Sequence, residues 1–205
     1  MAAQPILVDA ADGAVLDGDL DVPKAPWAAV VLTHPHPLYG GNRYSNVTDA
    51  LFRALPPLGI AVLRFDFRGV GNSTGEHDNG VAERLDVAGA LDTLAALVPE
   101  HPHVVVGYSF GAEVTLNVIH PAVTAWCAIA PPLSGSTPLA AADHRRKFIA
   151  VPEHDQYNPP SRAVTLTSTW MSTEIEVIRS ADHFLVGRLL AVTDMVVEFV
   201  RTVAG

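Results

Sequence analysis

The stretch His103-Val104-Val105-Val106-Gly107-Tyr108-Ser109-Phe110-Gly111-Ala112-Glu113 places a Gly-x-Ser-x-Gly motif directly after an apolar run. The run predicts a strand over residues 103–106, and the residues after Ser109 predict a helix over residues 110–119. The turn between them must be tight, which strains the backbone of Ser109 and raises its hydroxyl clear of the sheet. Glycine is required at 107 and 111 because a Cβ atom there would collide with the neighbouring strand or helix. This context favours Ser109 as a nucleophile over a helix N-cap serine between packing glycines.

Apolar runs of strand length alternate with segments of helical periodicity on both sides of this motif. Strands are predicted at residues 6–8, 14–21, 28–32, 60–65, 125–130, 147–151 and 174–178, and helices at residues 46–55, 81–98 and 184–203. The turn at Asp12-Gly13 predicts an antiparallel hairpin for the first two strands. From residue 28 onward the alternation predicts an α/β fold, with a mostly parallel central sheet and helices on both faces. Ligands of such sheets bind beyond the carboxyl ends of the strands, so the residues at those ends are the candidates for chemistry.

A serine hydroxyl needs a base to take its proton, and an imidazole oriented by a carboxylate is suited to that task. In folds with this motif the chain order is serine, then acid, then histidine. His183 follows the last predicted strand and is the only histidine after His154, so it is the candidate base. Asp155 and Glu153 both follow the strand at residues 147–151 and compete for the role of the acid, with Asp182 as a weaker third.

The negative charge that develops on a substrate oxygen needs prepositioned donors. The backbone N–H of Phe110, directly after the serine, is one expected donor. The second is expected from the loop that follows the strand at residues 28–32. Pro35 and Pro37 in that loop have no N–H, which leaves the backbone of His36 as the best donor there.

Two further patterns do not predict a cofactor or a metal site. His34 and His36 flank a rigid proline, cannot easily bring both rings to one ion, and have no nearby carboxylate or thiolate to complete a ligand set. The stretch Gly69-Val70-Gly71-Asn72-Ser73-Thr74-Gly75 resembles a phosphate-binding loop. Its third glycine, however, stands one residue too far for Gly-x-Gly-x-x-Gly, and no helix opens within it.

Composition sets the broad class of protein. The chain has 205 residues, of which 49% are hydrophobic and 17% charged, and this predicts one folded domain over residues 1–205. A net charge of −9 disfavours nucleic acid as a partner. The single cysteine, Cys127, lies in an apolar run and is expected to be a buried structural thiol. No apolar run is long enough to span a membrane and no signal peptide is visible, so we expect a cytoplasmic protein, monomeric or homodimeric, without a membrane partner.

The chain resembles the small, cap-less bacterial α/β-hydrolases, a group similar to the dienelactone-hydrolase branch. The resemblance covers residues 28 to about 200 and is specific for the fold and the catalytic side chains, while the substrate is left open. It implies a structural role for the Asp66-x-Arg68-Gly69 segment, which would tie down loops around the site. The motifs that carry the resemblance are His34-Pro35-His36-Pro37-Leu38-Tyr39-Gly40-Gly41, Phe65-Asp66-Phe67-Arg68-Gly69-Val70-Gly71-Asn72-Ser73, Gly107-Tyr108-Ser109-Phe110-Gly111 and Ala181-Asp182-His183-Phe184.

The resemblance also separates the candidate acids. Members of the group usually carry His-Gly-Asp-x-Asp after the acid-bearing strand, and the second Asp is catalytic. Here Val151-Pro152-Glu153-His154-Asp155 stands in that place, with Pro152 where glycine is usual. The resemblance therefore implies Asp155 as the acid of a Ser109, Asp155 and His183 triad.

The gap between the strands at residues 125–130 and 147–151 is too short for a helical lid, which predicts an open site. An open site favours small soluble carboxylic esters, cleaved through an acyl-enzyme on Ser109. The alternatives are thioester, amide or carbon–carbon bond hydrolysis with the same residues, or a non-catalytic scaffold used for binding. The residues expected to line the substrate pocket are Leu38, Tyr39, Tyr108, Tyr157 and Phe184.

Overall fold

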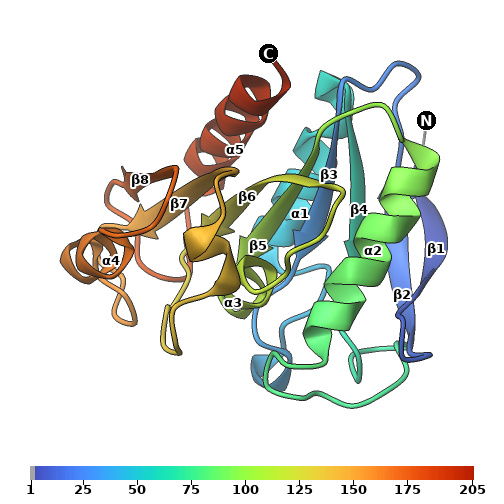
Figure 1. Ribbon diagram of the computed structural model, residues 1–205, viewed down its shortest axis with the longest axis horizontal. Helices are drawn as coiled ribbons and strands as arrows, with labels where there is room; N and C mark the ends of the chain where they lie inside the picture. The colour runs from blue at the N-terminus through green and yellow to red at the C-terminus, as the bar shows by residue number, and fades with distance from the viewer. Residues whose placement is uncertain (1–2) are drawn as a thin grey trace.

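The computed structural model describes residues 3–205 and shows a central sheet flanked by helices (Figure 1). Across these residues the sheet has eight strands in the order β1-β2-β4-β3-β5-β6-β7-β8. The strands are β1 (Gln4–Asp9), β2 (Val15–Asp21), β3 (Ala28–Thr33), β4 (Ile60–Phe65), β5 (His103–Tyr108), β6 (Val123–Ile129), β7 (Arg146–Pro152) and β8 (Thr173–Ile178). The helices are α1 (Asn46–Ala54), α2 (Glu83–Leu97), α3 (Phe110–Leu116), α4 (Pro160–Thr167) and α5 (Leu189–Ala204).

The pairing of the strands confirms the predicted α/β fold. β1 and β2 form the antiparallel hairpin, and β2 joins the rest of the sheet antiparallel to β4. From β3 onward all neighbouring strands are parallel. The hairpin turn has Gly13 at φ +89°, a conformation that side chains other than glycine rarely adopt. The parallel strands therefore end at one edge of the sheet, and the loops that follow β3, β5, β7 and β8 meet there.

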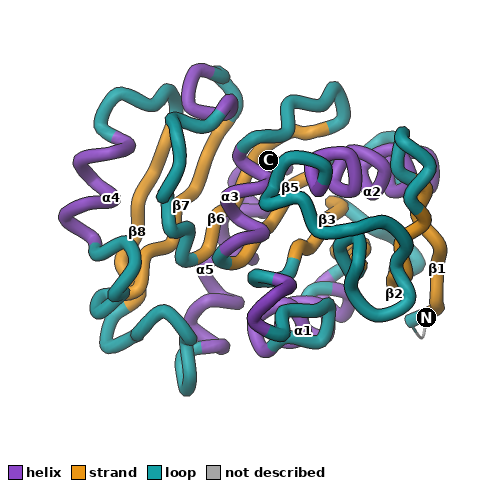
Figure 2. The backbone as a smooth tube through the Cα atoms, turned by 90° about the horizontal axis from the view of Figure 1, so that it is seen from below, coloured by secondary structure: helices purple, strands orange, loops and turns teal. Residues whose placement is uncertain are grey.

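The helices cover both faces of the sheet, as Figure 2 shows. One buried apolar cluster packs side chains of α2, α3 and α4 against the sheet, and a second packs those of α1 and α5 against the other face. Alternate residues of one strand serve the two clusters: Ala29 and Val31 belong to the first, and Val30 to the second. Strands covered on both faces read as continuous apolar runs, and this explains why β3 and β5 were visible in the sequence.

The predicted helix at residues 184–203 begins later than predicted, at Leu189. The side chain of Asp182 accepts hydrogen bonds from the N–H groups of Phe184 (3.1 Å) and Leu185 (3.2 Å). These bonds hold the segment before the helix in a turn. Leu185 and Gly187 both have positive φ, so this segment cannot continue a helix backwards from Leu189.

The helix predicted at residues 110–119 is also shorter and ends at Leu116. The side chain of Asn117 donates a hydrogen bond to the carbonyl of Glu113 (2.9 Å), a local bond that competes with continuation of the helix.

α4 was not predicted from the sequence. Its start carried one signal, the pair Pro159-Pro160, because proline is favoured at the first position of a helix. No helix in the described residues 3–205 has both the length and the apolar character that a membrane crossing requires.

Candidate active site

Ser109 lies at the sharp turn between β5 and α3, with φ 54° and ψ −118°. The predicted reason for the flanking glycines is confirmed. A Cβ atom on Gly107 would come within 2.6 Å of the Ala112 backbone, and one on Gly111 within 2.6 Å of the His34 carbonyl oxygen. The two glycines therefore permit the close approach that turns the serine hydroxyl out of the sheet edge.

The structure brings together three of the side chains proposed from the sequence. Ser109 Oγ lies 2.9 Å from His183 Nε2, and His183 Nδ1 lies 2.8 Å from Asp155 Oδ2. The three residues come from the loops after β5, β7 and β8, and all three are buried. This is the connectivity in which an imidazole can accept a proton from a hydroxyl while a carboxylate orients it.

The two competing acids lie elsewhere. Glu153 accepts hydrogen bonds from Arg179 (3.1 Å) and from the N–H of Ser180 (2.7 Å), which ties the ends of β7 and β8 together. Asp182 caps the turn that follows it. Of the three acids considered, Asp155 alone contacts the imidazole.

Asp155 is held by the loop that carries it. Its Oδ1 accepts hydrogen bonds from the N–H groups of Tyr157 (2.8 Å) and Asn158 (3.1 Å), while its Oδ2 faces His183. Both carboxylate oxygens are therefore satisfied although Asp155 is buried, as a buried charge requires.

His183 is fixed on its other side by tyrosines. The hydroxyl of Tyr108 donates to the His183 carbonyl oxygen (3.0 Å), and the ring of Tyr157 meets the imidazole edge-on with centroids 4.6 Å apart. Burial raises the pKa of Tyr108 well above its ordinary value, so this hydroxyl stays a donor. The imidazole is thereby held in one orientation toward Ser109.

The two backbone groups predicted to receive an oxyanion line the same cleft as Ser109. Within residues 3–205, neither the N–H of His36 nor that of Phe110 donates to a protein acceptor. The His36 carbonyl accepts from Tyr39 (3.1 Å) and Gly41 (3.0 Å), which fixes the loop. Both N–H groups are thus available donors beside the serine.

The side chains of His34 and His36 have separate environments. His34 is fully buried; its Nε2 accepts the N–H of Phe67 (3.0 Å) and its Nδ1 lies 2.7 Å from the Pro35 carbonyl oxygen. Burial lowers the pKa of His34 to about 4, so the ring is neutral at pH 7. His36 is partly exposed in the cleft, and burial lowers its pKa as well, with His77 adding to the effect.

A cleft of about 770 Å³ opens in front of Ser109 and His183. Tyr39, Tyr108, Tyr157 and Phe184 line it, as the sequence predicted. Leu38 does not and is 69% exposed, which corrects its placement in the pocket. It belongs to a 3₁₀ turn over Pro37–Tyr39, in which successive side chains point in different directions.

Sequence reasoning missed several lining residues: Asn46, Asn79, Glu113 and Ser134. One of them carried a signal, because Glu113 lies in the first turn of the helix that begins directly after Ser109. Asn79 and Ser134 come from loops with no periodic pattern. The long segment between β6 and β7 contains a single 3₁₀ turn, Leu139–Ala142, and leaves the cleft without a cap.

Asp66 and Arg68, which follow β4, form ion pairs with residues of other segments. Arg43 pairs with Asp66 (2.5 Å), and Arg68 pairs with Asp86 (2.6 Å) and Asp12 (2.8 Å). Burial raises the pKa of both Asp66 and Asp86 despite these arginines. The pairs join α2 and the β1–β2 hairpin to the loops below the cleft, in keeping with the structural role expected for this segment.

The uncapped sheet and the serine at its elbow define a small α/β-hydrolase. The chain belongs to the family described as "Serine aminopeptidase, S33", whose model matches residues 24–203.

Solved structures agree with this assignment. An α/β serine hydrolase homologue from Coxiella burnetii is 27% identical with a TM-score of 0.84, and the alignment covers 97% of each chain. An α/β serine hydrolase without lid from Xanthomonas campestris is 25% identical with a TM-score of 0.83, over 98% of this chain and 95% of that one.

A relative in sequence is an uncharacterized protein of Rickettsia prowazekii (strain Madrid E), which is 41% identical over 115 residues. The match covers 55% of this chain and 48% of the relative, so the chain spans about half the length of that protein.

Proposed function

We propose that the protein hydrolyses small carboxylic esters through an acyl-enzyme formed on Ser109. The observation that supports this most directly is the continuous hydrogen-bonded series from Asp155 through His183 to Ser109 at the floor of an open cleft. The serine hydrolase relatives support the same class of chemistry.

In the proposed reaction His183 Nε2 takes the proton of Ser109 as Oγ attacks the carbonyl carbon of the ester. Asp155 keeps the Nδ1 proton in place and stabilises the imidazolium that forms. The backbone N–H groups of His36 and Phe110 would receive the charge on the carbonyl oxygen. Collapse of the intermediate expels the alcohol, which takes the proton back from His183 and leaves the acyl group on Ser109.

The second half repeats the sequence with water. His183 removes a proton from a water molecule, the resulting hydroxide attacks the acyl-enzyme, and Ser109 leaves with the proton. The same steps would cleave a thioester or an amide, and the open cleft supports small, soluble substrates over long chains presented at a lipid interface.

A fluorophosphonate probe together with a short p-nitrophenyl ester tests the proposal. We expect the wild type to be labelled and to hydrolyse the ester, and Ser109→Ala to do neither. Asp155→Asn, which keeps the shape of the side chain, should lower kcat by about 10⁴-fold because the imidazole then takes the wrong tautomer. Equal labelling of wild type and Ser109→Ala, or no labelling of folded wild type, would contradict the nucleophile and favour a binding scaffold.

A further inference from the structure

The cleft holds one charged side chain that the proposed mechanism does not use. Among the lining residues that the structure describes, Glu113 is the only aspartate, glutamate, lysine or arginine. The other polar groups of the lining are histidines, tyrosines, serines and asparagines. A substrate in this cleft therefore meets one fixed negative charge.

Glu113 is held close to the nucleophile. It lies in the first turn of α3, which begins directly after Ser109, and its N–H contacts the Ser109 carbonyl oxygen at 3.3 Å. Ser109 and Glu113 both line the cleft, so the carboxylate and the serine hydroxyl face the same space.

The carboxylate is fixed by a loop and has no cationic partner in the described residues. Its Oε1 accepts hydrogen bonds from the N–H (2.6 Å) and the hydroxyl (3.0 Å) of Ser134, which lies in the loop after β6. Oε2 has one long contact with the same hydroxyl at 3.4 Å. Within residues 3–205 no lysine, arginine or histidine nitrogen lies within ion-pair distance of Glu113. One oxygen thus keeps free acceptor capacity.

The surroundings of Glu113 also suit a cation. Five aromatic rings line the cleft, and the faces of such rings attract ammonium groups. Arg84 lines an adjoining cavity of about 280 Å³, which Glu113 also borders, and it donates its Nε–H to the Gly80 carbonyl oxygen (3.0 Å). The net charge of −9 draws cations toward the molecule as a whole.

We propose that Glu113 makes the cleft selective for substrates that carry a cationic group, such as an ammonium, near the bond to be cleaved. This inference rests on the function proposed for Ser109 and names the substrate class of the same site. A partly buried carboxylate stabilises a nearby positive charge and penalises a negative one, whereas an uncharged group of equal shape gains nothing from it.

Two pairs of esters test the preference, one with the charge on the alcohol and one with the charge on the acyl group. The first pair is acetylcholine and its isostere with a tert-butyl group in place of the trimethylammonium group. The second pair is the p-nitrophenyl ester of trimethylammoniobutyrate and its tert-butyl isostere. Each pair differs in charge and keeps shape and reactive carbonyl the same, so the ratio of kcat/KM values isolates the charge.

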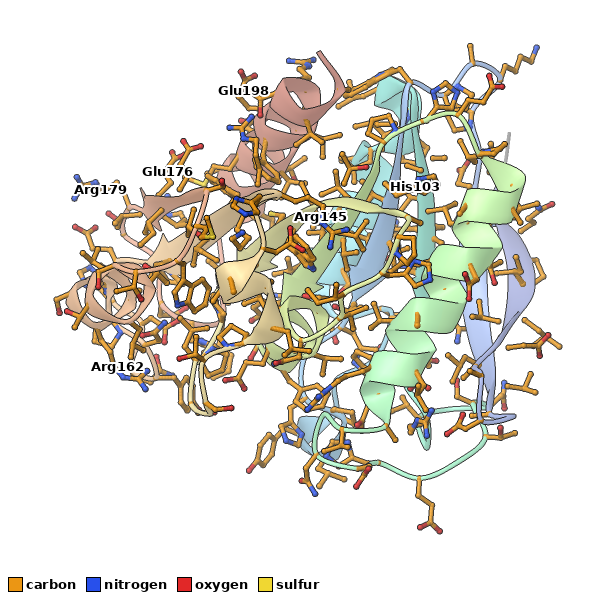
Figure 3. All side chains as sticks on the ribbon, in the orientation of Figure 1. His103, Arg145, Arg162, Glu176, Arg179 and Glu198 are labelled. Atoms are coloured by element: carbon orange, nitrogen blue, oxygen red, sulfur yellow. The ribbon has the colours of Figure 1, made fainter. Side chains whose placement is uncertain are left out.

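Glu113→Gln is the informative variant, because the amide oxygen can still accept from Ser134 while the charge is lost. Glu176→Gln is the matched control: Glu176 is exposed on the edge strand β8 (Figure 3) and its substitution changes the net charge equally. We expect wild type and Glu176→Gln to favour the cationic member of at least one pair by about fivefold at low salt. In Glu113→Gln the ratio should fall to about one, with hydrolysis of the uncharged isostere kept.

Equal rates within both pairs for the wild type would overturn the proposal, as would a preference that survives in Glu113→Gln. If Glu113→Gln lowers kcat/KM for both esters of a pair by the same factor, Glu113 has a structural role, and the proposal is also overturned.

Binding separates this inference from the hydrolytic function. The same esters are titrated into Ser109→Ala and into Ser109→Ala/Glu113→Gln and followed by NMR. Tighter binding of the cationic members, lost in the double variant, supports the cation site even if the wild type hydrolyses nothing. If the wild type hydrolyses the esters but cationic and uncharged members bind equally and react at equal rates, the result supports Ser109 as the nucleophile and contradicts the proposed role of Glu113.

Discussion

At the scale of single residues, the site depends on how closely backbone segments approach around Ser109. The serine has φ 54°, a conformation that costs free energy for a residue with a side chain. Gly107 and Gly111 allow α3 to begin directly against the loop that follows β3. The geometry of the nucleophile therefore depends on the lack of a Cβ atom at Gly107 and Gly111.

Gly111→Ala tests this close packing. The new Cβ would lie 2.6 Å from both the His34 carbonyl oxygen and Thr33 Oγ1. We expect the free energy of unfolding in urea to fall by about 3 kcal/mol, since backbone atoms must move to relieve the contact. Gly135→Ala is the control, because a Cβ there meets nothing within 4 Å. It should change stability by less than about 0.5 kcal/mol. Similar stabilities of the two variants would contradict the role given to Gly111.

At the scale of elements, α4 joins two loops that border the cleft. Its Arg162 donates to the carbonyl oxygens of Pro132 (2.8 Å) and Leu133 (3.0 Å) after β6. The same guanidinium donates to Asn158 Oδ1 (3.1 Å) in the loop that carries Asp155. Because a guanidinium offers several donors in a fixed plane, one side chain holds both loops. Figure 3 shows Arg162 at the end of the molecule where α4 lies.

Arg162→Met should lower kcat/KM for a short ester by about tenfold, because the loop that orients Asp155 loses its brace. Arg162→Lys should recover part of the activity, since one ammonium cannot reach all the acceptors. Arg201→Met on the exposed face of α5 serves as the control and should leave activity unchanged. Thermal unfolding of each variant is measured alongside. If Arg162→Met keeps full kcat/KM, or loses activity only as much as it loses folded protein, Arg162 does not position Asp155.

At the scale of the whole molecule, buried polar groups connect loops that follow different strands of the sheet. His34 is one of them, because its ring links the loop after β3 to Phe67 after β4. Its Nε2 can accept that hydrogen bond only while it is unprotonated. Burial lowers the pKa of His34 from 6.5 to about 4. Between these pH values the imidazole is therefore protonated in the unfolded chain and neutral in the folded protein.

Stability should therefore fall as the pH drops from about 6.5 to about 4. In that window the unfolded state binds more protons than the folded state, which favours unfolding by up to about 3 kcal/mol at the acid end. His34→Gln should be less stable at pH 7 but should lose less stability over the same window. His144→Gln, at an exposed position, is the control and should keep the slope of the wild type. Urea unfolding at a series of pH values measures these slopes, and parallel curves for wild type and His34→Gln would contradict the assignment.

The sequence by itself determined the class of fold and the candidates at the strand ends. Buried parallel strands must be apolar throughout, and a tight elbow must carry glycines, so β3, β5 and Ser109 are visible without coordinates. Chain order then pointed to His183, while the choice of Asp155 over Glu153 needed a resemblance.

Only the tertiary structure decided which groups meet. In the structure Asp155 contacts His183, Leu38 lies exposed outside the lining of the cleft, and Ser134 donates a hydrogen bond to Glu113. The structure also showed α4 and the contacts of Arg162. These pairings join residues far apart along the chain through loops that follow no periodic pattern. A local sequence reports burial and turn chemistry, whereas the distance between two loop side chains depends on how the whole sheet twists and packs.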